Sequence, residues 1–90
     1  MGIQVHIHKT HRQFTGGRET VDVGGATVGE CLWHLVRQHP DMQNMLFDGK
    51  GKLHNTLEIY LNMESTYPEE LARPTRDGDE IFITLMLAGG

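Results

Sequence analysis

The stretch from residue 20 to residue 38, TVDVGGATVGECLWHLVRQ, contains a strand signal followed directly by a helix signal. Val21 and Val23 alternate with polar residues, which is typical of a strand that buries one face. After two glycines, Thr27 and Glu30 have the spacing of a capping box. In that motif the threonine side chain accepts a hydrogen bond from the glutamate amide, and the carboxylate reaches back. The pattern predicts a helix that begins a few residues after a strand ends.

The predicted helix spans about residues 27–38 and ends before Pro40, because a residue that precedes proline avoids helical backbone angles. Its apolar positions recur at helical spacing and form one face, made of Val28, Cys31, Leu32, Leu35 and Val36. Cys31 could be a nucleophile near a helix N-terminus, but its place on this face favours a buried structural thiol. Trp33 lies off the face, so it either packs under a neighbouring loop or meets a partner.

Strands are predicted on both sides of this unit. Alternating apolar and polar residues mark the candidates, which are residues 3–8, 20–23, 57–61 and 81–87, with residues 45–47 as a weaker one. A loop containing Gly16-Gly17 joins the first two strands as a hairpin. Residues 63–79 are irregular; Leu71 is expected to anchor this loop, and Gly78 to take positive φ in a tight turn. The expected fold is α+β, one mixed sheet with a helix across one face.

Size and charge limit the function classes. At 90 residues and a net charge of −4, the chain is one domain and an improbable nucleic-acid binder. Its one cysteine excludes an internal disulfide and a multi-thiolate zinc site. No apolar run is long enough to span a membrane, and no secretory signal is recognisable, so a cytoplasmic location is expected. Residues 57–90 carry a net −5, which suits a basic partner or is simply a solvated surface.

Neither a metal site nor a catalytic constellation stands out. His6, His8 and His11 could together bind zinc or copper, but no cysteine or carboxylate lies nearby in sequence to complete the shell. A solvent-facing position on a strand and loop is therefore the favoured interpretation. Nucleophile-elbow, P-loop and dinucleotide-binding motifs are absent. We expect a protein that is not an enzyme and that holds no metal.

Apolar residues on the outward faces of the later strands are candidates for partner binding. Tyr60, Phe82 and Met86 alternate with the inward positions, and with His6 and His8 they could form a patch on the sheet face opposite the helix. Exposed apolar area of this kind often marks a binding surface, although single exposed aromatic residues are also normal.

The last residues, Leu87, Ala88, Gly89 and Gly90, form a candidate tail beyond a body of residues 1–86. Four extended residues reach at most about 14 Å. Glycine has no Cβ and tolerates any φ, so residues 87–90 could enter a narrow channel. The alternative is an ordinary frayed terminus.

Together these features resemble the ubiquitin-like (β-grasp) sulfur carriers, a family that includes the small subunit of molybdopterin synthase, the thiamine sulfur carrier and carriers for cysteine or homocysteine synthesis. The resemblance rests mainly on Gly89-Gly90 and on the Asp77-Gly78-Asp79 turn one strand upstream. The ββα start supports it. Residues 51–62 look most like the amino-acid-synthesis carriers.

The resemblance implies a function for the terminus. In this family an E1-like enzyme uses ATP and Mg²⁺ to adenylate the C-terminal carboxylate, here that of Gly90, and sulfur then replaces AMP to give a thiocarboxylate. A sulfur-accepting synthase is the second implied partner, and the carrier itself binds no cofactor. Gly89 and Gly90 are the expected sulfur-carrying residues. The resemblance implies partner contacts at Tyr60, Phe82, Met86, Leu87 and Ala88.

Four functions remain open from the sequence. The first is a sulfur carrier for a sulfur amino acid, either cysteine or homocysteine. The second is the same chemistry serving molybdopterin or thiamine biosynthesis. The third is a ubiquitin-like modifier that joins Gly90 to lysines of other proteins, and the fourth is a non-covalent β-grasp interaction module.

Overall fold

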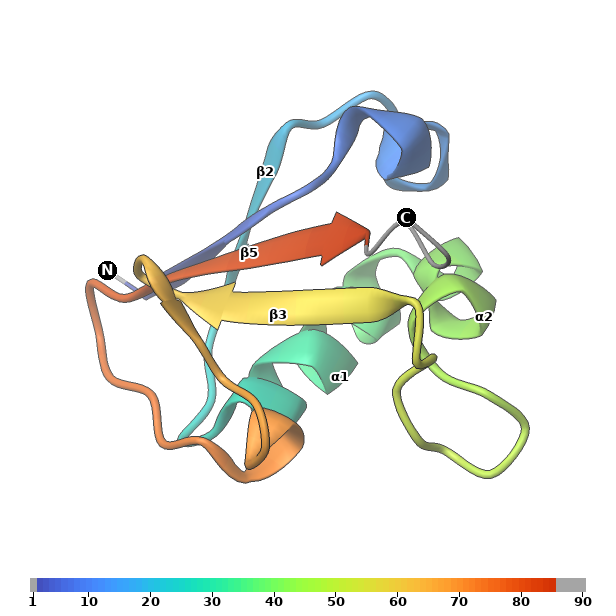
Figure 1. The fold of residues 1–90 in the computed structure, drawn as a ribbon. Helices are drawn as coiled ribbons and strands as arrows, with labels where there is room; N and C mark the ends of the chain where they lie inside the picture. The colour runs from blue at the N-terminus through green and yellow to red at the C-terminus, as the bar shows by residue number, and fades with distance from the viewer. Residues whose placement is uncertain (1, 86–90) are drawn as a thin grey trace.

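A computed structural model describes residues 2–85 as a five-stranded mixed sheet with helices packed on one face (Figure 1). The elements, in chain order, are β1 (Ile3–His6), η1 (Lys9–Thr15), β2 (Thr20–Val23), α1 (Val28–Gln38), η2 (Pro40–Met42), α2 (Gln43–Leu46), β3 (Leu57–Leu61), β4 (Glu64–Ser65), η3 (Glu70–Ala72) and β5 (Glu80–Leu85). The η elements are short 3₁₀ helices. The expected order of hairpin, helix, further strands and last strand is confirmed.

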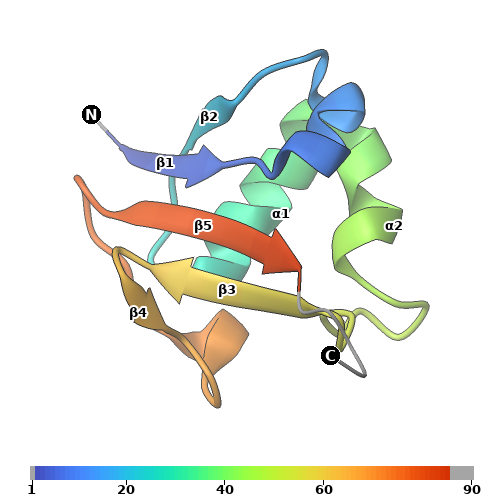
Figure 2. The same cartoon turned by 45° about the horizontal axis from the view of Figure 1, so that its top comes forward.

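The last strand lies in the middle of the sheet, whose order is β2-β1-β5-β3-β4. β5 runs parallel to β1 and antiparallel to β3, while β1 and β2 form the antiparallel hairpin. Figure 2 shows β1, β5, β3 and β4 side by side in front of α1. The first and last strands are thus neighbours in the sheet, and α1 lies across one face of it. The chain forms one layer of sheet packed on one layer of helix.

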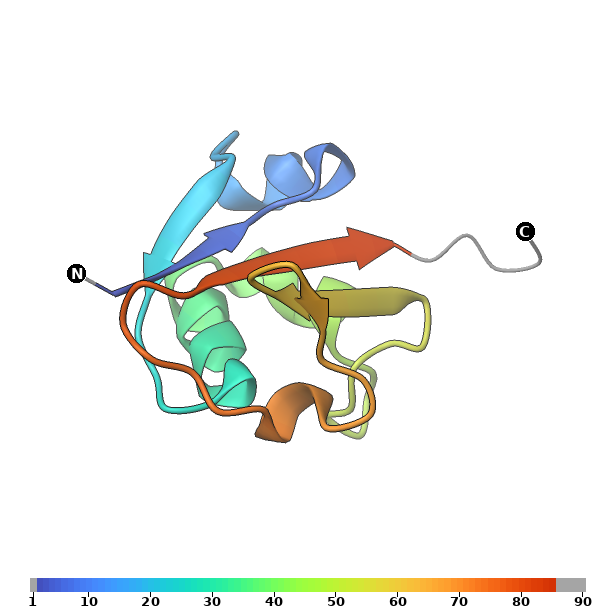
Figure 3. The ribbon, with the colours of Figure 1, turned by 60° about the vertical axis from the view of Figure 1, so that its left-hand side comes forward.

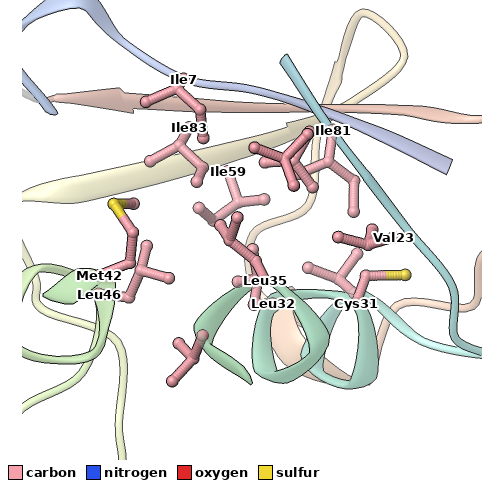
Figure 4. Packing of buried hydrophobic residues seen from close by; sticks show 14 of the residues in the cluster. Ile7, Val23, Cys31, Leu32, Leu35, Met42, Leu46, Ile59, Ile81 and Ile83 are labelled. Carbon is pink, nitrogen blue, oxygen red and sulfur yellow. The ribbon is translucent and has the colours of Figure 1, made fainter. Parts of the chain in front are cut away.

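The core lies between the sheet and α1 (Figure 4). Ile59, Ile81 and Ile83 project from the sheet toward Leu32 and Leu35 of the helix, and all five are nearly inaccessible to solvent. The remaining buried apolar residues are Ile3, Val5, Ile7, Val21, Val23, Val28, Cys31, Val36, Met42, Leu46, Phe47, Leu57 and Leu61. The inward positions predicted from strand alternation are therefore confirmed for β1, β2 and β3, and for Ile81 and Ile83 of β5.

The predicted start of α1 is confirmed in detail. The Thr27 hydroxyl accepts from the backbone N–H of Glu30 at 3.1 Å, and the Glu30 carboxylate accepts from the backbone N–H of Ala26 at 2.8 Å. These bonds satisfy amides that a helix N-terminus otherwise leaves without partners. Gly29 in the first turn lets Leu71 approach, since a Cβ there would lie 3.0 Å from the Leu71 carbonyl oxygen. Leu71 anchors its loop to the core as expected, and Figure 3 shows α1 and η3 on the same side of β5.

Two expectations about the middle of the chain are wrong or incomplete. The weak strand candidate at residues 45–47 is a helical turn, α2, because Met42 and Leu46 are four residues apart and both turn into the core. Phe47 makes only an isolated bridge with Leu53. Residues 63–79, expected to be irregular, contain the short β4 and η3. The Gly78 turn is confirmed, with φ +91°.

Among the helices of residues 2–85, none is both long and apolar enough to cross a membrane. The predicted boundary between body and tail, at residues 86–87, lies outside the described residues.

Candidate functional site

Three rings cross the sheet face opposite α1 in one row, which we call the aromatic row: His6, Phe82 and Tyr60. The strand register pairs Phe82 with His6 on β1 and with Tyr60 on β3. Each of the three side chains is half-buried. Residues on one strand alternate between the two faces of the sheet. The buried neighbours of these residues therefore point toward α1, and the aromatic row points to the opposite face.

Phe82 is held in place by the pair His6 and Glu80. The His6 and Phe82 rings stack with centroids 4.1 Å apart and an interplanar angle of 9°. His6 Nε2 lies 2.6 Å from Glu80 Oε1, which fixes the imidazole from its other side. A flat apolar ring with restricted motion loses little conformational entropy on binding a partner, which makes Phe82 a suitable anchor.

A second group of contacts fixes the start of β5. The backbone N–H of Asn62 donates to the Glu80 carbonyl at 2.7 Å, and the Glu80 N–H donates to Asn62 Oδ1 at 3.0 Å. Asn62 Nδ2 also donates to Asp79 Oδ1 at 3.2 Å. Asn62 has φ +56°, a conformation that asparagine tolerates better than most residues. Sequence reasoning missed both Glu80 and Asn62, because their partners come from distant parts of the chain.

The remaining predicted partner-binding residues divide into two groups. His8 does not join the patch, so that expectation is wrong: β1 ends at His6, and His8 instead caps η1 by accepting from the Thr10 N–H at 3.2 Å. Met86, Leu87, Ala88, Gly89 and Gly90 lie outside the described residues, and their roles stay predictions.

Cys31 takes the structural role favoured above, and Trp33 packs on a neighbouring ring. Cys31 is fully buried, and burial raises the pKa of its thiol, so the thiol stays protonated and poorly nucleophilic. Trp33 stacks on Phe47 with ring centroids 4.4 Å apart, although it remains partly exposed. The packing interpretation of Trp33 is therefore confirmed.

His11 belongs to η1 and is buried, so the solvent-facing position expected for it is wrong, and its Nδ1 has no hydrogen-bond partner among the described residues. In residues 2–85 no three histidine, cysteine or acidic side chains come close enough to hold a metal ion. Burial, reinforced by the nearby His8, lowers the pKa of His11 from its ordinary value. The folded protein therefore favours the neutral imidazole.

A pH dependence of stability follows from this histidine. The unfolded chain binds a proton at His11 more readily than the folded protein does, so stability is complete above the unfolded pKa and falls as the pH drops below it. We expect the free energy of unfolding, measured by urea denaturation, to decrease between pH 7 and pH 5. His11→Phe is expected to flatten this decrease, and an unchanged slope in that variant would show that other groups cause it.

Comparison with known proteins identifies the family. No protein-family model matches the chain. Small archaeal modifier protein 1 of Haloferax volcanii is 35% identical over 71 residues, which cover 78% of each protein. The chain belongs to the ubiquitin-like β-grasp family of small sulfur carriers and modifiers. The predicted β-grasp fold and family resemblance are confirmed, and the chain is thus a carrier or modifier rather than an enzyme.

Solved structures agree with this assignment. CysO of Mycobacterium tuberculosis superposes with a TM-score of 0.88 at 30% identity, over 96% of this chain and 100% of that one. The CysO in the BexX/CysO complex of Amycolatopsis orientalis superposes with a TM-score of 0.88 at 31% identity, over 99% of this chain and 100% of that one. The crystal structure of small archaeal modifier protein 1 of Haloferax volcanii gives 0.79 at 30%, over 98% of each chain.

Proposed function

We propose that this protein carries sulfur as a thiocarboxylate on Gly90. An E1-like enzyme with ATP and Mg²⁺ joins AMP to the carboxylate and releases pyrophosphate. Hydrosulfide sulfur then attacks the carbonyl carbon, and AMP leaves with the electron pair of the broken C–O bond. The resulting thiocarboxylate is a soft nucleophile that a sulfur-accepting synthase can use, so the chemistry belongs to the partners and the reactive group to the carrier.

The similarity to CysO over almost the whole of both chains is the observation that carries this proposal. In the Amycolatopsis orientalis structure a CysO is found in complex with BexX, which supports the expectation that this chain also docks on a partner protein. The aromatic row offers an outward-facing surface for such docking. It includes Phe82 of β5, the strand that precedes the proposed sulfur-carrying residues.

For the pathway, we propose biosynthesis of a sulfur amino acid, cysteine or homocysteine, in the cytoplasm. This choice rests on the resemblance of residues 51–62 to the amino-acid-synthesis carriers and on the similarity to CysO. Molybdopterin and thiamine biosynthesis use the same carrier chemistry and are the alternatives within this function.

A protein modifier is the second candidate, and the 35% identity to small archaeal modifier protein 1 favours it. In that case a lysine amine of a target attacks the activated Gly90 carbonyl and forms an isopeptide bond. Carrier and modifier share the activation step and differ only in the nucleophile.

Intact-mass spectrometry of the protein purified from its own host tests the proposal. We expect a species whose mass increase corresponds to one oxygen replaced by sulfur, located on Gly90 by fragmentation. An iodoacetamide-reactive terminus is the accompanying signature, because the thiocarboxylate alkylates readily while Cys31 is buried. Gly90 found only in linkage to lysines favours the modifier. A terminus that stays unmodified after incubation with the E1-like enzyme of the host, ATP and sulfide contradicts both.

A further inference from the structure

A cavity of about 510 Å³ opens beside the first half of β3. Its apolar lining residues are Leu53, which is half-buried, and Leu57 and Ile59, which are buried, and Glu58, Tyr67 and Glu70 also line it. Its volume falls within the range of roughly 300–1,000 Å³ that is usual for ligand pockets. We call it the β3-edge pocket.

The pocket exists because β4 covers only part of the β3 edge. β4 pairs with Tyr60 and Leu61 alone, so within the described residues no strand lies beside Leu57 and Glu58 on that edge. Just beyond β4, the N–H and hydroxyl of Thr66 both donate to the Ile59 carbonyl, at 3.0 and 2.8 Å. The chain then turns toward η3. Figure 1 shows it running away from the arrowhead end of β3, while the loop after α2 enters the strand at its other end.

The charges around the pocket are of one sign. Glu58 and Glu70 are among its lining residues, which include no lysine or arginine. The Glu58 carboxylate accepts from the Ser65 hydroxyl at 2.7 Å, which orients it and leaves acceptor capacity on its other oxygen. The Glu70 carboxylate has no hydrogen bond with the described residues. Arg73, a nearby cation, is paired with Glu64 and Glu69 outside the pocket.

We propose that the β3-edge pocket binds an arginine side chain of a partner polypeptide. An arginine has an apolar stem that suits the half-buried Leu53 and the exposed Tyr67 ring, and a planar head whose donors can meet Glu58 and Glu70. Hydrogen bonds between guanidinium and carboxylate are stronger than neutral ones. The proposal gives the acidic second half of the chain a defined binding role, and it requires no chemistry at Gly90.

Two capped pentapeptides test the occupant: ALRLA and the same peptide with citrulline in place of arginine. Citrulline keeps the shape of the side chain and removes its charge. In NMR titrations of the ¹⁵N-labelled protein, we expect the arginine peptide to shift the amide signals of residues 53–59, 65–67 and 69–70. We expect its affinity to exceed that of the citrulline peptide by about tenfold, equivalent to about 1.4 kcal/mol.

Matched charge variants test the roles of Glu58 and Glu70. The double variant Glu58→Gln with Glu70→Gln is expected to weaken arginine-peptide binding about tenfold, by the same conversion of about 1.4 kcal/mol. Glutamine still accepts from Ser65, so the fold is retained. Glu19→Gln with Asp41→Asn removes equal charge from exposed positions outside the pocket and is expected to leave affinity unchanged.

Several results would overturn the proposal. Equal binding of the two peptides would show that the charge is not recognised, and an equal loss in both double variants would show that only net charge matters. Shifts confined to the aromatic row would place the binding elsewhere. Concentration-dependent shifts at the pocket without peptide would identify a second copy of the chain as the occupant. None of these results bears on Gly90, so the proposed sulfur chemistry stands or falls separately.

Discussion

Deletion of Gly90 is expected to reduce adenylation of the protein by at least about 100-fold. The loss of one extended residue withdraws the terminal carboxylate by about 3.3–3.6 Å. Misplacing a reacting group by only about 1 Å can cost about 100-fold in rate, because the attacking atom must sit within contact distance of its target. The measurement is ATP–pyrophosphate exchange with the E1-like enzyme from the same host.

The same deletion is expected to leave stability unchanged. The buried cluster of the described residues extends from Ile3 to Ile83, and a glycine has no side chain to add to it. Thermal unfolding followed by circular dichroism should give the same midpoint for the deletion variant and the wild type. A lowered midpoint would mean that the loss of adenylation reflects unfolding rather than chemistry at the terminus.

Deletion of Ala88 is the matched control for reach. This variant keeps Gly89-Gly90 but shortens the tail by the same length. If reach is what matters, both deletions lose adenylation; if the identity of the terminal residues matters more, the Ala88 deletion retains activity. Wild-type exchange in the Gly90 deletion would contradict the assignment of Gly90 as the adenylated residue.

The parts of the fold that were predictable from sequence depend on local rules. The capping box of Thr27 and Glu30 and the apolar stripe of α1 involve residues at most a few positions apart, and the structure has both. The alternation in β1, β2 and β3 is equally local. These patterns follow from the repeat of the helix and of the strand, so they can be recognised in a short segment without knowledge of its tertiary contacts.

Other features depend on contacts that a local pattern does not contain. Residues 45–47 are three apolar residues that fit a strand or a helix, and only the spacing of Met42 and Leu46 favours the helical turn observed. β4 has two residues, too few to show any periodicity. The pair formed by His6 and Glu80 joins residues 74 positions apart, through the parallel contact of the first and last strands. The sequence alone therefore did not show that His6 and Glu80 hold the Phe82 ring in place.

Phe82→Ala is expected to raise the KM of the E1-like enzyme for this protein by about 30-fold. Central aromatic residues of interfaces often contribute about 2 kcal/mol when truncated to alanine, and that energy corresponds to about 30-fold in affinity. Phe82 fits this description because it lies between His6 and Tyr60, and the stacked imidazole holds its ring. The measurement is the dependence of exchange rate on carrier concentration.

Met63→Ala is the matched control, since it also removes a large exposed apolar side chain, 88% accessible, from the turn between β3 and β4. We expect its KM to equal that of the wild type. An equal effect in both variants would mean that general apolar surface, not the aromatic row, determines docking. Thermal unfolding of Phe82→Ala shows whether the variant remains folded at the assay temperature.

Phe82→Ala and the deletion of Gly90 should separate docking from chemistry. Seven residues separate Phe82 from Gly90 in the sequence, and its ring takes no part in the reaction. We therefore expect its contacts with the enzyme to be the same before and during adenylation, so their loss raises KM while kcat is retained. Deletion of Gly90 leaves the aromatic row intact and withdraws the carboxylate that reacts, so it lowers kcat with little change in KM. A fall in kcat for Phe82→Ala at saturating carrier would mean that the row also positions the tail, because binding energy away from the reacting atoms would then be used in the transition state.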